Sequence, residues 1–112
     1  MITTIRQGEN FNPCIKFTYK KTGAPVDLSG CTAYSQMKDK PGGNLVATAI
    51  CEIDGMQGRI SVVYSSEDTE NIPVGKYGYD VWLIPNGDES EKRPVWTEEV
   101  EVIGRYTDNF GA

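Results

Sequence analysis

Three cysteines are the first residues in this chain that could do chemistry. Cys14, Cys31 and Cys51 match no paired zinc motif, and the sequence contains no histidine. The absence of histidine removes the commonest zinc ligand and the commonest general base. A nucleophilic cysteine needs a neighbouring base, so we expect Cys31 and Cys51 to be small, reduced residues of the core. The odd count leaves a disulfide between two of the three open without implying one.

Two clusters of carboxylates are the other candidates for chemistry. They are Glu67-Asp68-Glu70 and Asp88-Glu89-Glu91. General acid–base catalysis needs two carboxylates that converge on one pocket, whereas these clusters fall in a helical turn and a hairpin loop. No calcium loop, phosphate cradle or nucleophile elbow occurs in the sequence. The sequence therefore predicts no catalytic residues, no cofactor and no metal, and a protein that is not an enzyme.

The charge balance restricts the class of partner. The chain of 112 residues has a formal net charge of -5 and a pI near 4.6. Its dense basic spots are Lys20-Lys21 and Lys92-Arg93, and an acidic domain repels phosphate backbones. No apolar stretch approaches a membrane-spanning length or the core of a signal peptide. We therefore expect synthesis in the reducing cytoplasm and neither nucleic acid nor membrane as a partner.

Alternation of apolar and polar residues predicts an all-β chain. Turn residues recur every eight to twelve positions, and they separate seven expected strands: Ile2–Arg6, Phe11–Tyr19, Cys31–Lys38, Leu45–Ile53, Arg59–Tyr64, Lys76–Ile84 and Pro94–Ile103. Cap residues followed by acids predict one short helical turn near Ser65–Ile72, before Pro73. This pattern favours a seven-stranded antiparallel immunoglobulin-like β-sandwich over residues 1–104, followed by a polar tail at 105–112.

The alternation also divides the side chains into inward and outward sets. Tyr77 follows the helical turn, where such sandwiches have a tyrosine corner. Glu98 shares the inward parity of the last strand. The predicted structural core is Phe17, Ile60, Val62, Tyr77, Tyr79, Val81, Leu83, Trp96 and Val100.

Trp82 and Ile84 have the parity opposite to this core, which places them on the outer face. An exposed tryptophan beside an isoleucine indicates a protein contact. The alternative is an indole that lies flat across its own sheet. We expect the protein interface to include Trp82, Ile84, Asp80 and Phe110.

An ordered set of short segments carries a family resemblance over most of the chain. The segments are 5–11 (IRQGENF), 23–30 (GAPVDLSG), 36–43 (QMKDKPGG), 58–62 (GRISV), 72–81 (IPVGKYGYDV) and 100–102 (VEV). Together they resemble a domain of tailed-phage and prophage proteins whose best-described members form the N-terminal domain of phage baseplate upper proteins. The sequence departs from that family at Glu98, where the family tends to have glycine.

The resemblance implies an immunoglobulin-like building block of the virion with no catalytic residues. Its function would be that of a structural or assembly subunit of the tail, neck or baseplate. Its partners would be other phage structural proteins and further copies of itself in a homo-oligomer. The alternative that the residues leave open is a decoration or adhesive module that binds a carbohydrate or a host surface, because exposed aromatic rings also stack on sugars.

Overall fold

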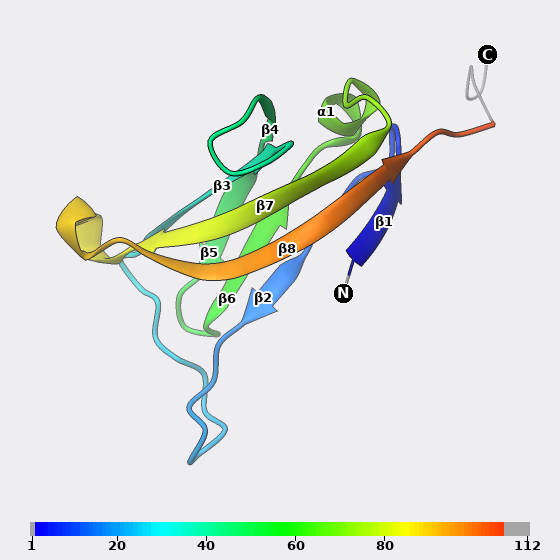
Figure 1. Ribbon diagram of the computed structural model, residues 1–112. Coiled ribbons are helices and arrows are strands. Elements are labelled where there is room, and N and C mark those ends of the chain that lie inside the picture. Colours follow the sequence, from blue (N-terminus) through cyan, green and yellow to red (C-terminus); the bar gives the residue numbers. More distant parts are fainter. Residues whose placement is uncertain (1, 107–112) are drawn as a thin grey trace.

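The protein is built from two β-sheets (Figure 1). The computed structural model describes residues 2–106. The larger sheet has the strand order β1-β8-β7-β3-β4, and the smaller sheet has the order β2-β6-β5. The elements are β1 Ile2–Arg6, β2 Cys14–Lys16, β3 Thr32–Lys38, β4 Leu45–Thr48, β5 Ile50–Asp54, β6 Arg59–Val63, α1 Ser66–Glu70, β7 Gly75–Ile84, the 3₁₀ turns η1 Pro85–Gly87 and η2 Glu89–Glu91, and β8 Arg93–Ile103.

The strands differ from the sequence prediction in three ways. The strand expected over Phe11–Tyr19 is reduced to β2 at Cys14–Lys16. The single strand expected over Leu45–Ile53 divides at Ala49, so that β4 joins the larger sheet and β5 joins the smaller one. This crossing explains why apolar residues occur on both faces of that segment. The sheets are also not wholly antiparallel, because β1 pairs in parallel with β8. The described residues therefore form eight strands rather than seven.

The core lies between the two sheets. Ile60 and Val62 of the smaller sheet are buried, as are Tyr79, Val81, Leu83 and Val100 of the larger sheet. Phe17 and Tyr77 are partly buried and pack against this core. Each fully buried aliphatic side chain stabilises the fold by about 1.5–3 kcal/mol. Residues that the sequence analysis did not select are also fully buried: Ile5, Met37, Tyr64 and Ile72.

Trp96 was expected in the core, and this prediction was wrong, since the residue is 41% exposed. The cause is its position in the sheet. Trp96 lies opposite Val81 and so has the inward parity, but β1 pairs with β8 only from Glu99 onward. The preceding part of β8 is therefore an edge of the sheet. The indole Nε1 of Trp96 donates to Tyr79 Oη at 3.1 Å, and this hydroxyl donates to Glu98 Oε1 at 2.9 Å.

The helix α1 connects the two sheets and is fixed at both ends. Ser65 Oγ accepts a hydrogen bond from the backbone N–H of Asp68 at 3.2 Å, which is a helix N-cap. The buried Thr69 donates through Oγ1 to the carbonyl of Glu9 at 2.7 Å. After the helix, Tyr77 Oη donates to the carbonyl of Pro73 at 2.6 Å. The short helical turn expected near Ser65–Ile72 is thus present as α1.

Three aromatic rings occupy the centre of the core. The ring centroids of Phe11, Tyr64 and Tyr79 lie 5.6–6.1 Å apart. The hydroxyls of Tyr64 and Ser35 share a buried hydrogen bond of 2.7 Å. Tyr64 directly follows β6 of the smaller sheet and Ser35 belongs to β3 of the larger one, so this bond joins the sheets. Burial raises the pKa of the Tyr64 and Tyr79 phenols far above their usual value.

The Tyr64–Ser35 hydrogen bond leads to a double-mutant test. Ser35→Ala leaves the Tyr64 hydroxyl buried without a partner, so we expect the free energy of unfolding to fall by about 1–3 kcal/mol. Tyr64→Phe in the Ser35→Ala background removes that unpaired hydroxyl and should restore part of the loss. Urea unfolding of the two single variants and the double variant measures the coupling. If the losses of unfolding free energy in the two single variants simply add in the double variant, the Ser35 and Tyr64 hydroxyls do not depend on each other, which would contradict this account.

Candidate interaction surface

The outer face of the larger sheet presents its side chains in cross-strand rows. Tyr34 of β3 lies opposite Trp82 of β7. In the next row, Gln36 lies opposite Asp80, and Asp80 lies opposite Thr97 of β8. Residues directly opposite each other in an antiparallel pair project from the same face. These five side chains therefore form one continuous surface, with two aromatic rings at one end.

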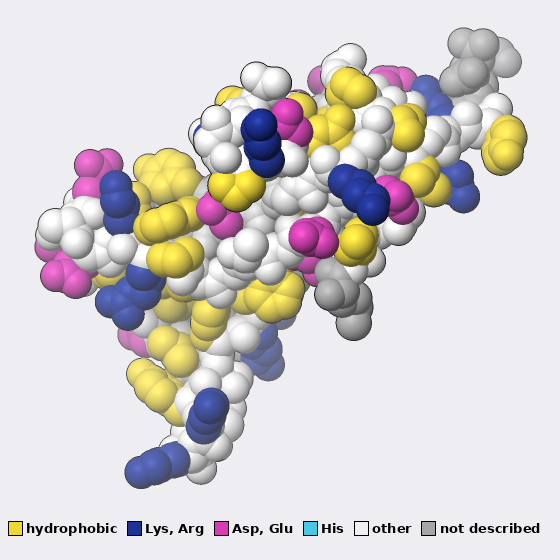
Figure 2. Space-filling model, in the orientation of Figure 1, with side chains coloured by type: hydrophobic (Ala, Val, Ile, Leu, Met, Phe, Trp, Pro, Cys, Tyr) yellow, Lys and Arg dark blue, Asp and Glu magenta, His cyan; other side chains and the backbone are white. Residues whose placement is uncertain are grey.

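A row without a central side chain follows. Lys38, Gly78, Glu99 and Ile2 lie side by side across β3, β7, β8 and β1. Because glycine occupies the centre of this row, the sheet surface is hollowed there. The β3–β4 loop at residues 39–42 forms a wall beside it, and the resulting groove has a volume of about 960 Å³. On this face, hydrophobic side chains lie among charged ones over β7 and β8 (Figure 2).

The indole of Trp82 has a fixed orientation in this groove. Its Nε1 donates to Asp80 Oδ2, two residues earlier on the same strand, at 3.0 Å. Trp82 is partly buried, whereas its cross-strand neighbour Tyr34 is 60% exposed. The indole of Trp82 is thus partly covered by its own sheet, because it is hydrogen-bonded to a residue of the same strand. Its polar atom already has a partner, so covering the ring would leave no indole N–H unsatisfied.

Of the two remaining predicted interface residues, Ile84 and Phe110, only Ile84 lies within the described part of the chain. Ile84 was expected on the outer face, but it is only 8% exposed. It still pairs with Thr32 in the β3–β7 ladder, but it is the last residue of β7 and the N-cap of η1, where the chain turns. The expectation that Ile84 is exposed was therefore wrong. Phe110 lies outside the described residues.

Tyr34 is the residue that sequence reasoning missed. Alternation within the expected strand Cys31–Lys38 puts Tyr34 only on the face opposite to Ala33 and Ser35. The cue that identifies it as part of a site is long-range, because only the pairing of β3 with β7 brings it beside Trp82.

The cysteines lie outside the groove and are not bonded to one another. Cys14 is exposed, and Cys31 and Cys51 are partly buried. Cys31 and Cys51 line a smaller hollow of about 330 Å³ together with Ala33 and Ile53. Burial raises the pKa of the Cys51 thiol, which lowers the fraction of the reactive thiolate at neutral pH.

Within residues 2–106, no group of three or more Cys, Asp or Glu side chains is arranged to hold a metal ion. In the same part of the chain, no helix has the length and apolar character needed to cross a bilayer. No protein-family model matches the sequence, and a search of curated proteins gives no significant match.

The glycine at the floor of the groove gives a prediction about stability. A Cβ at Gly78 would meet nothing closer than the Glu98 carbonyl at 3.7 Å, so Gly78→Ala should raise the free energy of unfolding by about 0.5–1 kcal/mol. Gly58 is the matched control, because its φ of +62° and two carbonyl oxygens within 2.7 Å leave no room for a Cβ. Gly58→Ala should lower the same quantity by more than about 1 kcal/mol. Equal losses in chemical denaturation would contradict an open groove floor.

Proposed function

We propose that the protein is a non-enzymatic structural or assembly subunit of a tailed-phage virion, in the tail, neck or baseplate. It acts through protein–protein contacts with other phage structural proteins and with further copies of itself. The ordered segments that resemble the phage domain support this assignment. The outer face of the larger sheet supports it independently, because it offers a contact surface that the core does not need.

The strand order favours the immunoglobulin-like version of a two-sheet fold. In variable-type immunoglobulin domains, one sheet contains strands G, F, C and C′, and the other contains B, E and D. The orders β8-β7-β3-β4 and β2-β6-β5 correspond to these two sets. The bond from Tyr77 Oη to the Pro73 carbonyl, at the beginning of β7, has the form of a tyrosine corner.

The observation that carries the proposed function is the Tyr34–Trp82 pair. Protein interfaces are enriched in tyrosine and tryptophan, and a few such residues dominate the binding energy. Both rings lie on one face, and Asp80 holds the indole of Trp82 in place. A fixed side chain loses little conformational entropy on binding, so Trp82 is preorganised for contact.

A carbohydrate is the second candidate ligand for the same face. The groove combines two aromatic rings with the polar side chains of Gln36, Asp80 and Thr97, which is a combination suited to sugar rings and hydroxyls. Under this alternative, the protein is a decoration or adhesive module that binds a glycan on a host surface. Titration with neutral oligosaccharides, monitored by tryptophan fluorescence, distinguishes the two candidates.

Trp82→Ala tests the proposed protein contact. Because Trp82 is outside the core, we expect the free energy of unfolding to change by about 1 kcal/mol or less. Incorporation into phage particles should fall roughly tenfold or more, as expected for the loss of an interface hot spot. Tyr106→Ala is the control, since it removes a fully exposed aromatic ring that does not line the groove. Normal incorporation of the Trp82 variant would contradict the proposal.

A further inference from the structure

A hairpin between β2 and β3 projects away from both sheets (Figure 1). We name it the basic arm, residues Thr18–Pro25, and every one of its residues is exposed. Its strands are joined to each other by the Thr18–Pro25 bridge and by a hydrogen bond of 2.9 Å from the Tyr19 N–H to the Ala24 carbonyl. The arm therefore contributes almost nothing to the core of its own chain.

The arm is nevertheless held in one direction. At its base, the Phe17 N–H donates to the Gly58 carbonyl at 2.8 Å, and the Val26 N–H donates to the Phe17 carbonyl at 3.0 Å. At its tip, Gly23 has a φ of +71° and donates to the Tyr19 carbonyl at 2.8 Å. Such a hairpin is preorganised, so docking it elsewhere costs little conformational entropy.

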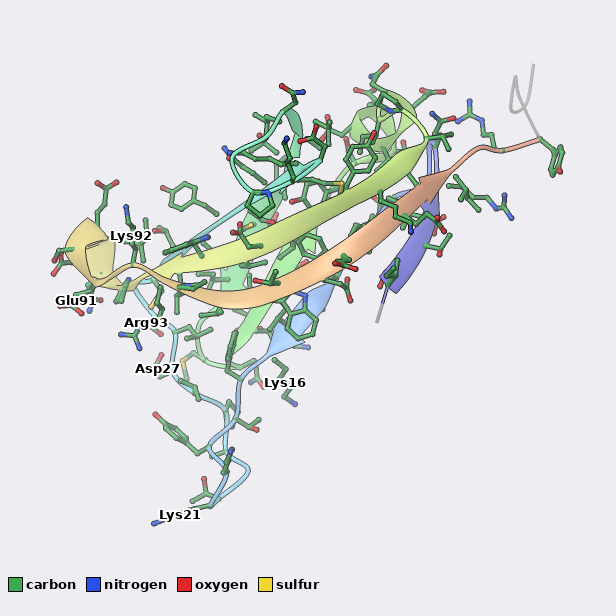
Figure 3. All side chains as sticks on the ribbon, viewed as in Figure 1. Lys16, Lys21, Asp27, Glu91, Lys92 and Arg93 are labelled. Carbon is green, nitrogen blue, oxygen red and sulfur yellow. The ribbon has the colours of Figure 1, made fainter. Side chains whose placement is uncertain are left out.

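The tip of the arm carries two cations in an acidic protein. Lys20 and Lys21 take part in neither of the ion pairs found among residues 2–106, which join Arg59 to Asp54 and Arg105 to Glu70. Figure 3 shows Lys21 at the far end of the arm, well away from the other basic spot at Lys92 and Arg93. That second spot has Asp88, Glu89 and Glu91 directly before it in sequence, whereas the tip has no adjacent acid.

The groove offers a carboxylate and aromatic rings, which are the partners that the lysines of this tip lack. At the aromatic end, the rows Tyr34–Trp82 and Gln36–Asp80–Thr97 contain one charged group, the carboxylate of Asp80. The lysines of the groove, Lys38, Lys40 and Lys76, lie toward its other end, on the rows beyond Gln36–Asp80 and on the β3–β4 loop. No residue of the arm lines the groove of its own chain. A lysine placed at the aromatic end would meet a carboxylate and the faces of two aromatic rings.

We propose that the basic arm of one copy docks into the aromatic end of the outer-face groove of a second copy. Lys20 and Lys21 contact Asp80 and the rings of Tyr34 and Trp82 of that copy. This inference rests on the proposed function, because it names the partner of the same surface. The two contacting surfaces differ, so the contact is heterologous and repeats from copy to copy into a ring or a filament.

The size of the contact sets the affinity to expect. A single hairpin tip in a groove buries less area than a standard stable interface, so each contact belongs to the weak class. Assembly then occurs at high local concentration, as on a particle that presents many copies. Since charge steers the contact, salt of about 1 M, which shortens the Debye length to about 3 Å, should weaken it.

Dilution of the full chain, followed by NMR and sedimentation velocity, tests the proposal. Up to about 1 mM, where an interaction of about -4 kcal/mol half-saturates, the mean mass should rise above one copy. The indole N–H signal of Trp82 should move with concentration together with the amides of the arm. A chain that stays a single copy at about 1 mM would overturn the inference, as would self-association with an unchanged Trp82 signal.

Charge reversal supplies the matched variants. Lys20→Glu/Lys21→Glu should weaken self-association roughly tenfold or more, because it places like charges against Asp80. Lys92→Glu/Arg93→Glu makes the same change in net charge at the other basic spot; because Arg93 precedes Pro94, which lies opposite Trp82, this variant adds negative charge beside the acceptor and should leave association unchanged or strengthen it. Equal association constants for the two variants would overturn the inference. So would a Trp82 signal that responds to a neutral oligosaccharide but not to dilution.

The outcomes separate this inference from the proposed function. If the chain remains a single copy in solution but enters particles in a Trp82-dependent way, the virion role stands and the second copy is the wrong partner. If the chain self-associates through the arm but Trp82→Ala particles assemble normally, the arm contact stands as a property of the free protein and the virion role fails.

Discussion

The hydrogen bond of 2.7 Å between the hydroxyls of Tyr64 and Ser35 joins the two sheets inside the core. It fixes Ser35 as an inward residue of β3. Because side chains alternate along a strand, Tyr34 and Gln36 must then project from the outer face. A slip of one residue in β3 would bury Tyr34 and expose the Ser35 hydroxyl. The same buried interaction that stabilises the core therefore also determines which residues of β3 line the groove.

The strand β7 separates stability from contact in the same way. Tyr79 and Val81 are buried among the aromatic and aliphatic side chains of the core, whereas the alternate residues Asp80 and Trp82 face outward. Gly78 adds the hollow, because a strand residue without a side chain leaves the sheet surface open. Changes on the outer face can therefore alter binding while the core keeps its packing. This separation allows the contacts of the outer face to change independently of the fold.

Local patterns predicted β7 and its core residues, since alternation over a long strand is a strong signal. Local patterns gave wrong predictions for features that depend on pairing between strands far apart in the sequence. Trp96 has the inward parity, but the short length of β1 leaves that part of β8 at a sheet edge. The division of the segment Leu45–Ile53 between two sheets and the parallel pairing of β1 with β8 are also long-range facts. Tyr34 becomes part of a site only through its pairing with Trp82. The sequence therefore predicted the residues that β7 contributes to the groove, Asp80 and Trp82, but not the one that β3 contributes.

The central claim is that the outer face of the larger sheet is covered when the protein assembles. Hydroxyl-radical footprinting of the free chain and of the assembled particle measures this directly, because exposed aromatic side chains oxidise readily. We predict that Tyr34 and Trp82 are protected in the assembly while the fully exposed Tyr106 is oxidised at the same rate in both states. Equal oxidation of Tyr34 and Trp82 in the free and assembled states would contradict the claim and leave the outer face without a role in contact.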